Sequence, residues 1–238
     1  IAALIEEHNL DLKNCKVLDP REESGMAEKY ADILYLKRAR KGMTRYDALK
    51  SMQDRNYFGA AMLNENEGDV LISGLTKDYA QTIKPALRLI GVADGSSRVA
   101  GMYILNTKRE TYFFADTTVN VDPSVEDLVE IIGLTAEKVR MFGEVPRIAL
   151  LSYSNFGTNR GKEPEKIQQA LKIAKSRWPN LLIDGEVQAN IALNPTLLKE
   201  LYPFSDLAEK GANTLIFPNL AAGNIAYKLL QEIGGAEA

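Results

Sequence analysis

The stretch RIALLSYSNFGTNRG, residues 147–161, has a pattern that recurs along much of this chain. An apolar run, Ile148–Leu151, is followed directly by hydroxyl and amide side chains and then by Gly157. A short apolar run bounded by turn residues is typical of a buried strand, and the polar residues after it are typical of a loop. The stretch therefore predicts a core strand that ends in a polar loop. The pattern leaves open whether the loop binds a phosphorylated ligand or is a solvated turn.

Strands and helices alternate around this stretch. Apolar runs at 181–183 and 214–217 predict further strands, and helical patterns cover 124–142, 164–177, short segments up to 201 and a segment from Asn224 onward. Residues 98–106 and 111–115 indicate an antiparallel hairpin. Ser124 with Asp127 is typical of a capped helix start. The alternation predicts a mostly parallel sheet with helices on both faces.

The N-terminal part of the chain combines helical patterns with two short apolar runs. Strands are predicted at 17–18 and 69–73, and helices at 1–12, 26–41, from Thr44 to about Met52, 57–63 and 79–90. The turn at 92–97 is the best boundary and divides the chain into 1–97 and 98–238. No cap precedes Ile1 and no closing element follows Gly234, so the chain is expected to begin inside a helix and to end in a flexible terminus or a cut. The family resemblance described below implies in addition that the first subdomain is incomplete and lacks its N-terminal and C-terminal elements.

Composition restricts the possible functions. With 238 residues, 45% of them apolar, the chain can bury a large core. A net charge of -3 argues against nucleic acid and anionic membranes as partners, and no apolar run or leader pattern predicts a membrane span or export, so a cytoplasmic location is expected. Cys15 and His8 are the only cysteine and histidine. An internal disulfide and a cysteine-based zinc site are therefore excluded, and a Ser-His-Asp triad is disfavoured.

Polar residues follow four of the predicted strands. Because parallel strands end at the same edge of a sheet, these residues are expected to line one cleft. The candidates at that edge are Asp116, Ser152, Ser154, Asn155, Asp184, Gln188, Asn219 and Asn224. The two aspartates are candidates for an acid/base pair or for metal ligands, although such residues more often fix turns. The helix from Asn224, which carries Lys228, has either an anion-binding N-terminus or an ordinary cap.

Two segments, one rich in glycine and one basic, bear on phosphate binding. Gly157–Lys162 resembles a phosphate-binding P-loop and is not one, because its glycine spacing is one residue short and Glu163 stands in place of Ser or Thr. The charge run from Lys37 to Lys41 suits a helix C-terminus, and an arginine within it could also reach a phosphate.

Five longer strings resemble the phosphate acetyl/butyryl transferase family: AAMLNENEGDVLISG at 60–74, FFADTTVNVDP at 113–123, RIALLSYSNFG at 147–157, LLIDGEVQANIALNP at 181–195 and NTLIFPNLAAGNIAYKLLQ at 213–231. Within that family, DPRE, RKGMT, NYFGAAM, SYSNFG and PNLAAGNI resemble the transferase-like C-terminal domain of bacterial NADP-dependent malic enzymes. The resemblance implies an α/β fold of two three-layer α/β/α subdomains, similar to isocitrate and isopropylmalate dehydrogenases. A cleft between them would bind CoA and acetyl phosphate.

The resemblance also implies roles for single residues. Arg38 matches a family arginine near the acyl-phosphate and CoA site, and Lys84 stands where the transferases carry another. Asp78 and Tyr79 replace small hydroxyl residues of a phosphate-binding loop, and Glu232 replaces a further arginine. The family's catalytic serine, arginine and aspartate would lie beyond Ala238. These departures imply a degenerate cleft without catalytic residues of its own.

The expected function is therefore that of a regulatory and oligomerisation domain of malic enzyme. It would sense acetyl-CoA or a related CoA ester, form a dimer through 98–238, and hold no cofactor or metal itself. Malate oxidation, with NADP and Mg or Mn, would take place in other domains of the same polypeptide. The alternative is an active phosphate acetyltransferase, which converts acetyl-CoA and phosphate into acetyl phosphate and CoA. A dehydrogenase of the isopropylmalate type carries little weight, because a cluster of metal-binding aspartates is lacking.

Overall fold

The computed structural model describes residues 2–74, 76–93 and 95–237. The chain forms two compact units, residues 1–93 and 94–238, called unit 1 and unit 2 below. The boundary expected from the sequence, between 97 and 98, lies a few residues farther along the chain. Among the described residues, no helix is both long and apolar enough to span a membrane.

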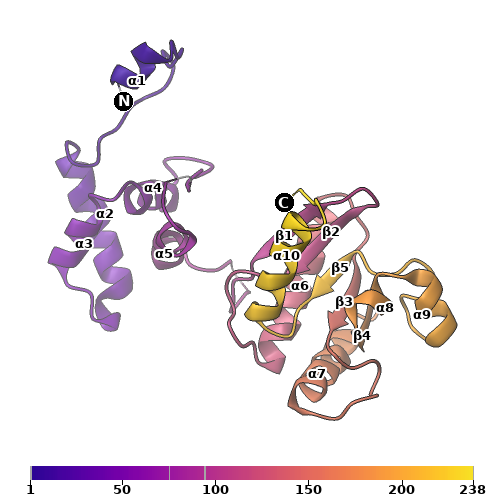
Figure 1. Cartoon of the computed structure of the whole chain (residues 1–238). Coiled ribbons are helices and arrows are strands. Elements are labelled where there is room, and N and C mark those ends of the chain that lie inside the picture. Colours follow the sequence, from indigo (N-terminus) through magenta and orange to yellow (C-terminus); the bar gives the residue numbers. More distant parts are fainter. Residues whose placement is uncertain (1, 75, 94, 238) are drawn as a thin grey trace. The chain divides into compact units, whose positions relative to one another are not determined.

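The described part of unit 1 is helical (Figure 1). Its elements are α1 (Ala2–Glu7), α2 (Ser24–Arg38), the short 3-10 helix η1 (Ala39–Lys41), α3 (Arg45–Ser51), α4 (Arg55–Asn64) and α5 (Tyr79–Leu89). Tyr30, Leu34, Met52, Phe58 and Leu89 are buried together in its core. Gly42 ends η1 in the left-handed region, with φ 83°, and Thr44 caps α3 in a reciprocal capping box with Asp47. The predicted helix starts and stops in this unit are therefore largely confirmed.

The strands predicted at 17–18 and 69–73 are wrong, because neither segment is a strand in the structure. Val70 is 76% exposed and Ile72 is 92% exposed. An extended segment becomes a strand only when a neighbouring strand pairs with its N–H and C=O groups. Within the described residues of unit 1 these segments have no such neighbour, so the predicted α/β/α layering of the first subdomain is not found there.

Unit 2 contains a five-stranded sheet in the order β1-β2-β5-β3-β4. The strands are β1 (Met102–Asn106), β2 (Thr111–Ala115), β3 (Arg147–Leu151), β4 (Leu182–Val187) and β5 (Thr214–Ile216). The β1–β2 hairpin is antiparallel, as predicted, whereas β2, β5, β3 and β4 run parallel. The prediction of a mixed α/β fold with a mostly parallel sheet is confirmed for this unit.

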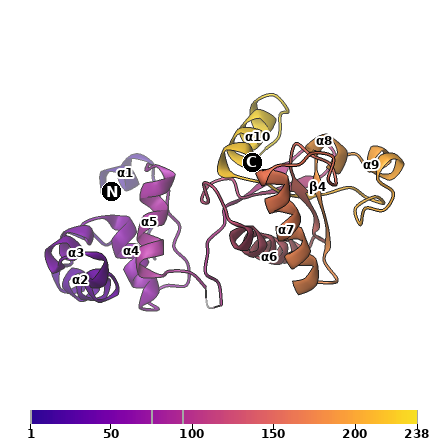
Figure 2. The same ribbon diagram turned by 90° about the horizontal axis from the view of Figure 1, so that it is seen from below.

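Helices cover both faces of this sheet (Figure 2). They are α6 (Val125–Met141) and α7 (Lys162–Arg177) on one face, and α8 (Ala189–Ala192), α9 (Pro195–Leu201) and α10 (Leu220–Glu232) on the other. Strand β3 serves both cores through the alternation of its side chains. Ile148 and Leu150 pack in the α6/α7 core, while Ala149 and Leu151 pack in the opposite one.

Two element boundaries differ from the sequence prediction and move predicted site residues. Strand β4 continues to Val187, so Asp184 lies inside the strand opposite Ala149 and not at its end. Helix α10 begins at Leu220 because the Asn219 side chain caps it, so the start predicted at Asn224 is wrong. In β4, aspartate and glycine have low strand propensity, but the pairing of Asp184 and Gly185 with β3 overrides this preference.

Candidate functional site

The carboxyl ends of four parallel strands meet at one edge of the sheet in unit 2. These ends follow Ala115 in β2, Ile216 in β5, Leu151 in β3 and Val187 in β4. The polar segments noted in the sequence at 116–120, 152–155, 188 and 218–224 therefore lie along a common edge, called the carboxyl edge below. Open parallel sheets bind ligands at this edge.

The loop after β3 is held by a buried carboxylate, Glu186 of β4. Glu186 is 1% exposed, and its Oε1 accepts hydrogen bonds from Ser154 Oγ at 2.9 Å and from the Gly157 N–H at 2.7 Å. The Phe156 N–H donates to the Glu186 carbonyl at 2.7 Å. Among the described residues, the second oxygen, Oε2, has no partner. The SYSNFG loop is therefore a rigid wall of the carboxyl edge and not a freely solvated turn.

A second group of bonds joins the same loop to the end of β4. Gln188 donates its N–H to Asn155 Oδ1 at 2.8 Å and its Nε2 to the Tyr153 carbonyl at 2.7 Å. Ser152 Oγ points to Glu163 Oε1 at 3.5 Å. The structure thus brings Ser152, Ser154, Asn155 and Gln188 together, largely bonded to one another and to the backbone.

Asp116 and Asp184 both have structural partners that saturate their carboxylates. Asp116, 3% exposed, accepts from the N–H groups of Thr118, Val119 and Asn120 at 2.8 to 3.0 Å and from Asn120 Nδ2. Asp184 accepts from the N–H groups of Gly185 and Asp206 and forms an ion pair of 3.3 Å with Lys175. Asp116 fixes the loop after β2, and Asp184, which lies inside β4, holds the backbone at Asp206, so both carboxylates have structural partners.

Lys175 forms ion pairs with two carboxylates, those of Asp184 and Asp206. Burial lowers the pKa of Lys175, but its hydrogen bond to Asp206 and the charge of Asp184 outweigh burial and raise the pKa above the ordinary value. Lys175 therefore stays charged and neutralises two carboxylates.

The residues of α10 lie at the same edge but do not form an anion site at the helix start. Asn219 Oδ1 accepts from the Ala222 N–H at 3.0 Å, and the Leu220 N–H donates to the Val121 carbonyl at 3.1 Å. Asn224 donates its Nδ2 to the Thr117 carbonyl at 3.2 Å. Lys228 is exposed, with Nζ 5.8 Å from the ring centre of Tyr227. The N–H groups that an anion would need are largely occupied.

A cavity of about 470 Å³ opens at the carboxyl edge beside the starts of α6 and α7. Its lining residues are Asp122, Pro123, Ser124, Asp127, Lys162, Glu163, Lys166 and Asn219. Lys166 Nζ already binds Asp122 at 3.0 Å and the Pro218 carbonyl at 3.2 Å. Acidic and basic groups in this cavity largely compensate one another, so it lacks the positive field that would attract a phosphate by itself.

Unit 1 has a cavity of about 500 Å³ that is lined mainly by basic side chains, and we call it the cationic pocket. Four basic side chains line it, against one acidic side chain, Asp47; the basic ones are Arg38, Lys41, Lys50 and Arg88. They come from the end of α2, from η1, from α3 and from α5. Hydrogen bonds from the Thr44 side chain and N–H lower the pKa of Asp47, so its charge persists and partly offsets the four cations.

Arg38 has a structural role as well as a place in the cationic pocket. Its Nε donates to the Arg88 carbonyl at 3.0 Å and its Nη2 to the Leu87 carbonyl at 2.5 Å. The neighbouring Lys37 Nζ donates to the Leu89 carbonyl at 2.5 Å. Cations suit the C-terminus of α5, where carbonyl groups lack helical partners. Lys84 lies exposed on α5 and is not among the described lining residues of the pocket.

Sequence reasoning missed Lys50, Arg88 and Glu186 as members of these sites. Lys50 and Arg88 are polar residues of helices, a pattern that carries no functional signal by itself. Glu186 lies 32 residues from Ser154 in the sequence, and only the β3–β4 pairing brings the two together. Lys41 belongs to the charge run at 37–41, which does carry a signal.

Comparisons with known proteins assign the chain to a family. The family model described as phosphate acetyl/butaryl transferase matches residues 1–238. The phosphate acetyltransferase of Bacillus subtilis is 37% identical over the whole chain, which spans 73% of that relative. The phosphate acetyltransferase of Synechocystis is 36% identical over 95% of this chain, which spans only 32% of that longer protein. The crystal structure of a phosphotransacetylase from Streptococcus pyogenes, 34% identical, superposes with a TM-score of 0.87 over 99% of this chain and 71% of that one.

These relatives overturn the malic-enzyme expectation, which was wrong. The matches at this identity and coverage are phosphate acetyltransferases, and none of those described above is a malic enzyme. The expected oxidoreductase activity, NADP and malic-enzyme catalytic domains rested on short motifs such as SYSNFG. Short motifs that belong to a shared fold do not separate one branch of a family from another. The chain belongs to the phosphate acetyl/butaryl transferase family.

Proposed function

We propose that the protein transfers an acetyl group between acetyl-CoA and inorganic phosphate, giving acetyl phosphate and CoA. The relatives named phosphate acetyltransferase supply the reaction class. The observation in this chain that carries the proposal is the cationic pocket, in which four basic side chains face one carboxylate. Phosphate, acetyl phosphate and the phosphate groups of CoA are anions, and charge-assisted hydrogen bonds from Arg and Lys bind such groups.

The acidic residue Asp78 does not argue against this proposal, although it replaces a small hydroxyl residue of the family pattern. Asp78 is the N-cap of α5, and its carboxylate accepts from the Gln81 N–H at 2.8 Å. Ser, Thr and Asp are all favourable N-caps, so the replacement preserves a helix start. Glu232, the last residue of α10, is exposed. Solvent screens an exposed charge and weakens its repulsion of a ligand.

A likeness to the fold of isocitrate and isopropylmalate dehydrogenases is also part of this proposal, although the described residues of unit 1 lack a layered α/β/α subdomain. It rests on the sequence resemblance alone.

The direct test is an assay of the full-length protein with acetyl phosphate and CoA. We expect the absorbance of the thioester to rise with a turnover between about 1 and 1000 per second, the common range for enzymes. Omitting either substrate is the control. A flat trace, from a protein that still binds CoA in calorimetry, would reject the transferase activity and leave a binding protein.

Replacing Arg38 by alanine should weaken CoA binding by roughly ten-fold. A hydrogen bond between charged partners contributes on the order of 1.5 to 3 kcal/mol, and about 1.4 kcal/mol corresponds to a factor of ten. Isothermal calorimetry with CoA measures the change. Lys37→Ala is the matched control, because Lys37 also binds the end of α5 but is not among the described pocket residues. Equal affinities for wild type and Arg38→Ala would assign Arg38 to helix capping only.

We further propose that the protein forms a dimer through residues 98–238. The β1–β2 hairpin does not expose Phe113 and Phe114 to a partner, since both are buried within their own unit. Helix α10 and the residue that follows it instead expose more than half of Ile225, Leu229 and Ile233, which lie one turn apart along one stripe. Sedimentation at micromolar concentration should show a dimer, and Leu229→Glu should yield monomers with an unchanged circular dichroism spectrum. A wild-type protein that sediments as a monomer would contradict the dimer.

A further inference from the structure

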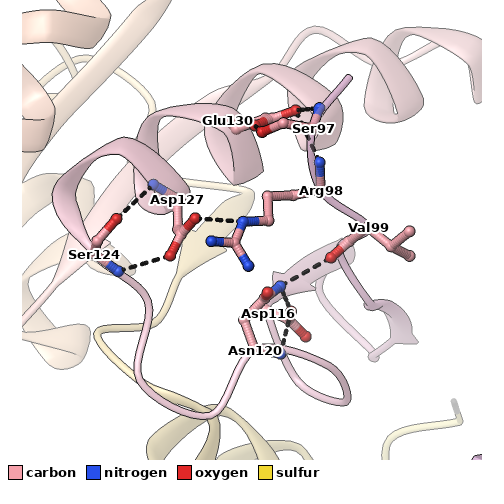
Figure 3. Close-up of polar contacts among 8 residues, drawn as sticks. All are labelled: Ser97, Arg98, Val99, Asp116, Asn120, Ser124, Asp127 and Glu130. Carbon is pink, nitrogen blue, oxygen red and sulfur yellow. Dashed lines mark hydrogen bonds and ion pairs between the residues drawn. The ribbon is translucent and has the colours of Figure 1, made fainter. Parts of the chain in front are cut away.

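The segment Ser97–Gly101, through which the chain enters unit 2, lies against the loop that follows β2 (Figure 3). The Thr117 N–H donates to the Gly101 carbonyl at 3.3 Å. A Cβ atom at Gly101 would lie only 1.7 Å from Thr118 Oγ1, so the Thr118 side chain packs directly against the Gly101 backbone. We call Ser97–Gly101 the entry segment.

Glu130 of α6 holds the start of the entry segment. Its carboxylate accepts hydrogen bonds from the Ser97 N–H, from Ser97 Oγ and, at 3.1 Å, from the Arg98 N–H. Hydrogen bonds from the Ser97 side chain, and then from the Ser97 and Arg98 N–H groups, lower the pKa of Glu130. The carboxylate is therefore charged at neutral pH and accepts three donors at once.

Asp127 holds the Arg98 side chain, one turn earlier on α6. The Asp127 carboxylate lies 2.6 Å from Arg98 Nε and also accepts from the Ser124 N–H at 3.1 Å, which closes the capping box of α6. The Asp127 side chain is 15% exposed and that of Arg98 is 51% exposed, so solvent screens this ion pair from the arginine side. The same residue lines the cavity at the carboxyl edge.

Asp116 and Asn120 hold the middle of the entry segment. Asn120 Nδ2 donates both to the Val99 carbonyl, at 2.9 Å, and to Asp116 (Figure 3). Asp116 in turn fixes the loop by accepting three of its backbone N–H groups. Asp116 thus reaches the entry segment through Asn120 and has no carboxylate oxygen left for a ligand.

We propose that Asp116, Asn120, Asp127 and Glu130 form an anchor that makes the entry segment a fixed part of the carboxyl edge. Asp116 is then a positioning residue, which acts on the entry segment through Asn120. This inference goes beyond the proposed acetyl transfer and does not depend on it, because it concerns the unliganded chain.

Hydrogen–deuterium exchange of the full-length protein tests the anchor. Glu130→Ala removes the acceptor of the Ser97 and Arg98 N–H groups, and we expect these amides to exchange at least ten-fold faster, with protection in β3 and β4 unchanged. Glu137→Ala is the matched control, since Glu137 is an exposed carboxylate on the same helix with no described hydrogen bond. The control should leave exchange in the entry segment as it is.

Asn120→Ala tests the second arm, because it separates Asp116 from the entry segment without changing a charge. We expect faster exchange of the Thr117, Ser97 and Arg98 amides at an unchanged thermal midpoint. A role in general stability alone would instead lower the midpoint and raise exchange throughout unit 2. The anchor is overturned if the Ser97 and Arg98 amides already exchange like those of an unfolded peptide in the wild type. It is also overturned if both variants leave these rates unchanged, or if they accelerate exchange evenly across unit 2.

Discussion

Replacing Glu186 by alanine is expected to lower the free energy of unfolding of unit 2 by about 3 kcal/mol. The substitution removes the acceptor of Ser154 Oγ and of the Gly157 N–H. A hydrogen bond within a protein contributes about 0.5 to 1.5 kcal/mol, and a buried donor without a partner costs about 1 to 3 kcal/mol. Because the loop can relax partly toward water, we expect the loss in unfolding free energy to lie near the middle of the range that two such bonds and two such donors span.

Urea denaturation followed by tryptophan fluorescence measures this loss. Trp178 is the only tryptophan and follows α7, so its fluorescence reports unit 2. Glu186→Gln should cost less, about 1 kcal/mol, because its amide oxygen still accepts while its NH2 replaces the unpartnered Oε2. Glu163→Ala removes a partly buried carboxylate at the same edge and should have little effect. If Glu186→Ala and wild type unfold at the same urea concentration, Glu186 does not hold the loop.

Replacing Gly223 by alanine is expected to destabilise unit 2 by about 2 kcal/mol, although alanine favours helices. Gly223 lies buried in the first part of α10, and an added Cβ would lie 2.4 Å from the Asp116 carbonyl oxygen. The gain in helix propensity is at most about 1 kcal/mol, whereas overpacking of a core costs about 1 to 3 kcal/mol. The obstacle is a backbone atom of a loop tied down by hydrogen bonds, so it cannot move aside cheaply.

A second helical glycine supplies the control for this prediction. Gly25 lies in α2, and nothing lies within 4 Å of the position that its Cβ would take. Gly25→Ala should therefore be neutral or stabilising by up to about 1 kcal/mol, whereas Gly223→Ala should lower the midpoint of thermal unfolding. Circular dichroism measures both variants. A neutral Gly223→Ala would show that α10 can shift away from the loop after β2.

The sequence by itself determined the features that depend on neighbours a few residues apart. The helix start at Thr44, the capping box of Ser124, the helix end before Gly42 and the β1–β2 hairpin all follow from local spacing. The alternation of strands and helices after Ala115 was enough to predict a mostly parallel sheet. The long motifs were enough to identify the family, because a family assignment needs many matching positions. The short SYSNFG and PNLAAGNI motifs led to the wrong branch of that family, the malic enzymes.

Tertiary structure alone decided which polar residues are free and which are already bonded. Asp116 and Asp184 looked like candidates for chemistry, but their partners come from loop backbones and, for Asp184, from Lys175 and Asp206. The cationic pocket combines residues of several helices, and Glu186 meets Ser154 only through strand pairing. The segment at 69–73 has strand propensity but no described pairing partner, and β4 extends past Asp184 because β3 pairs with it. Propensity and spacing act over a few residues, whereas hydrogen-bond partners and charges between distant segments are set only when the chain packs.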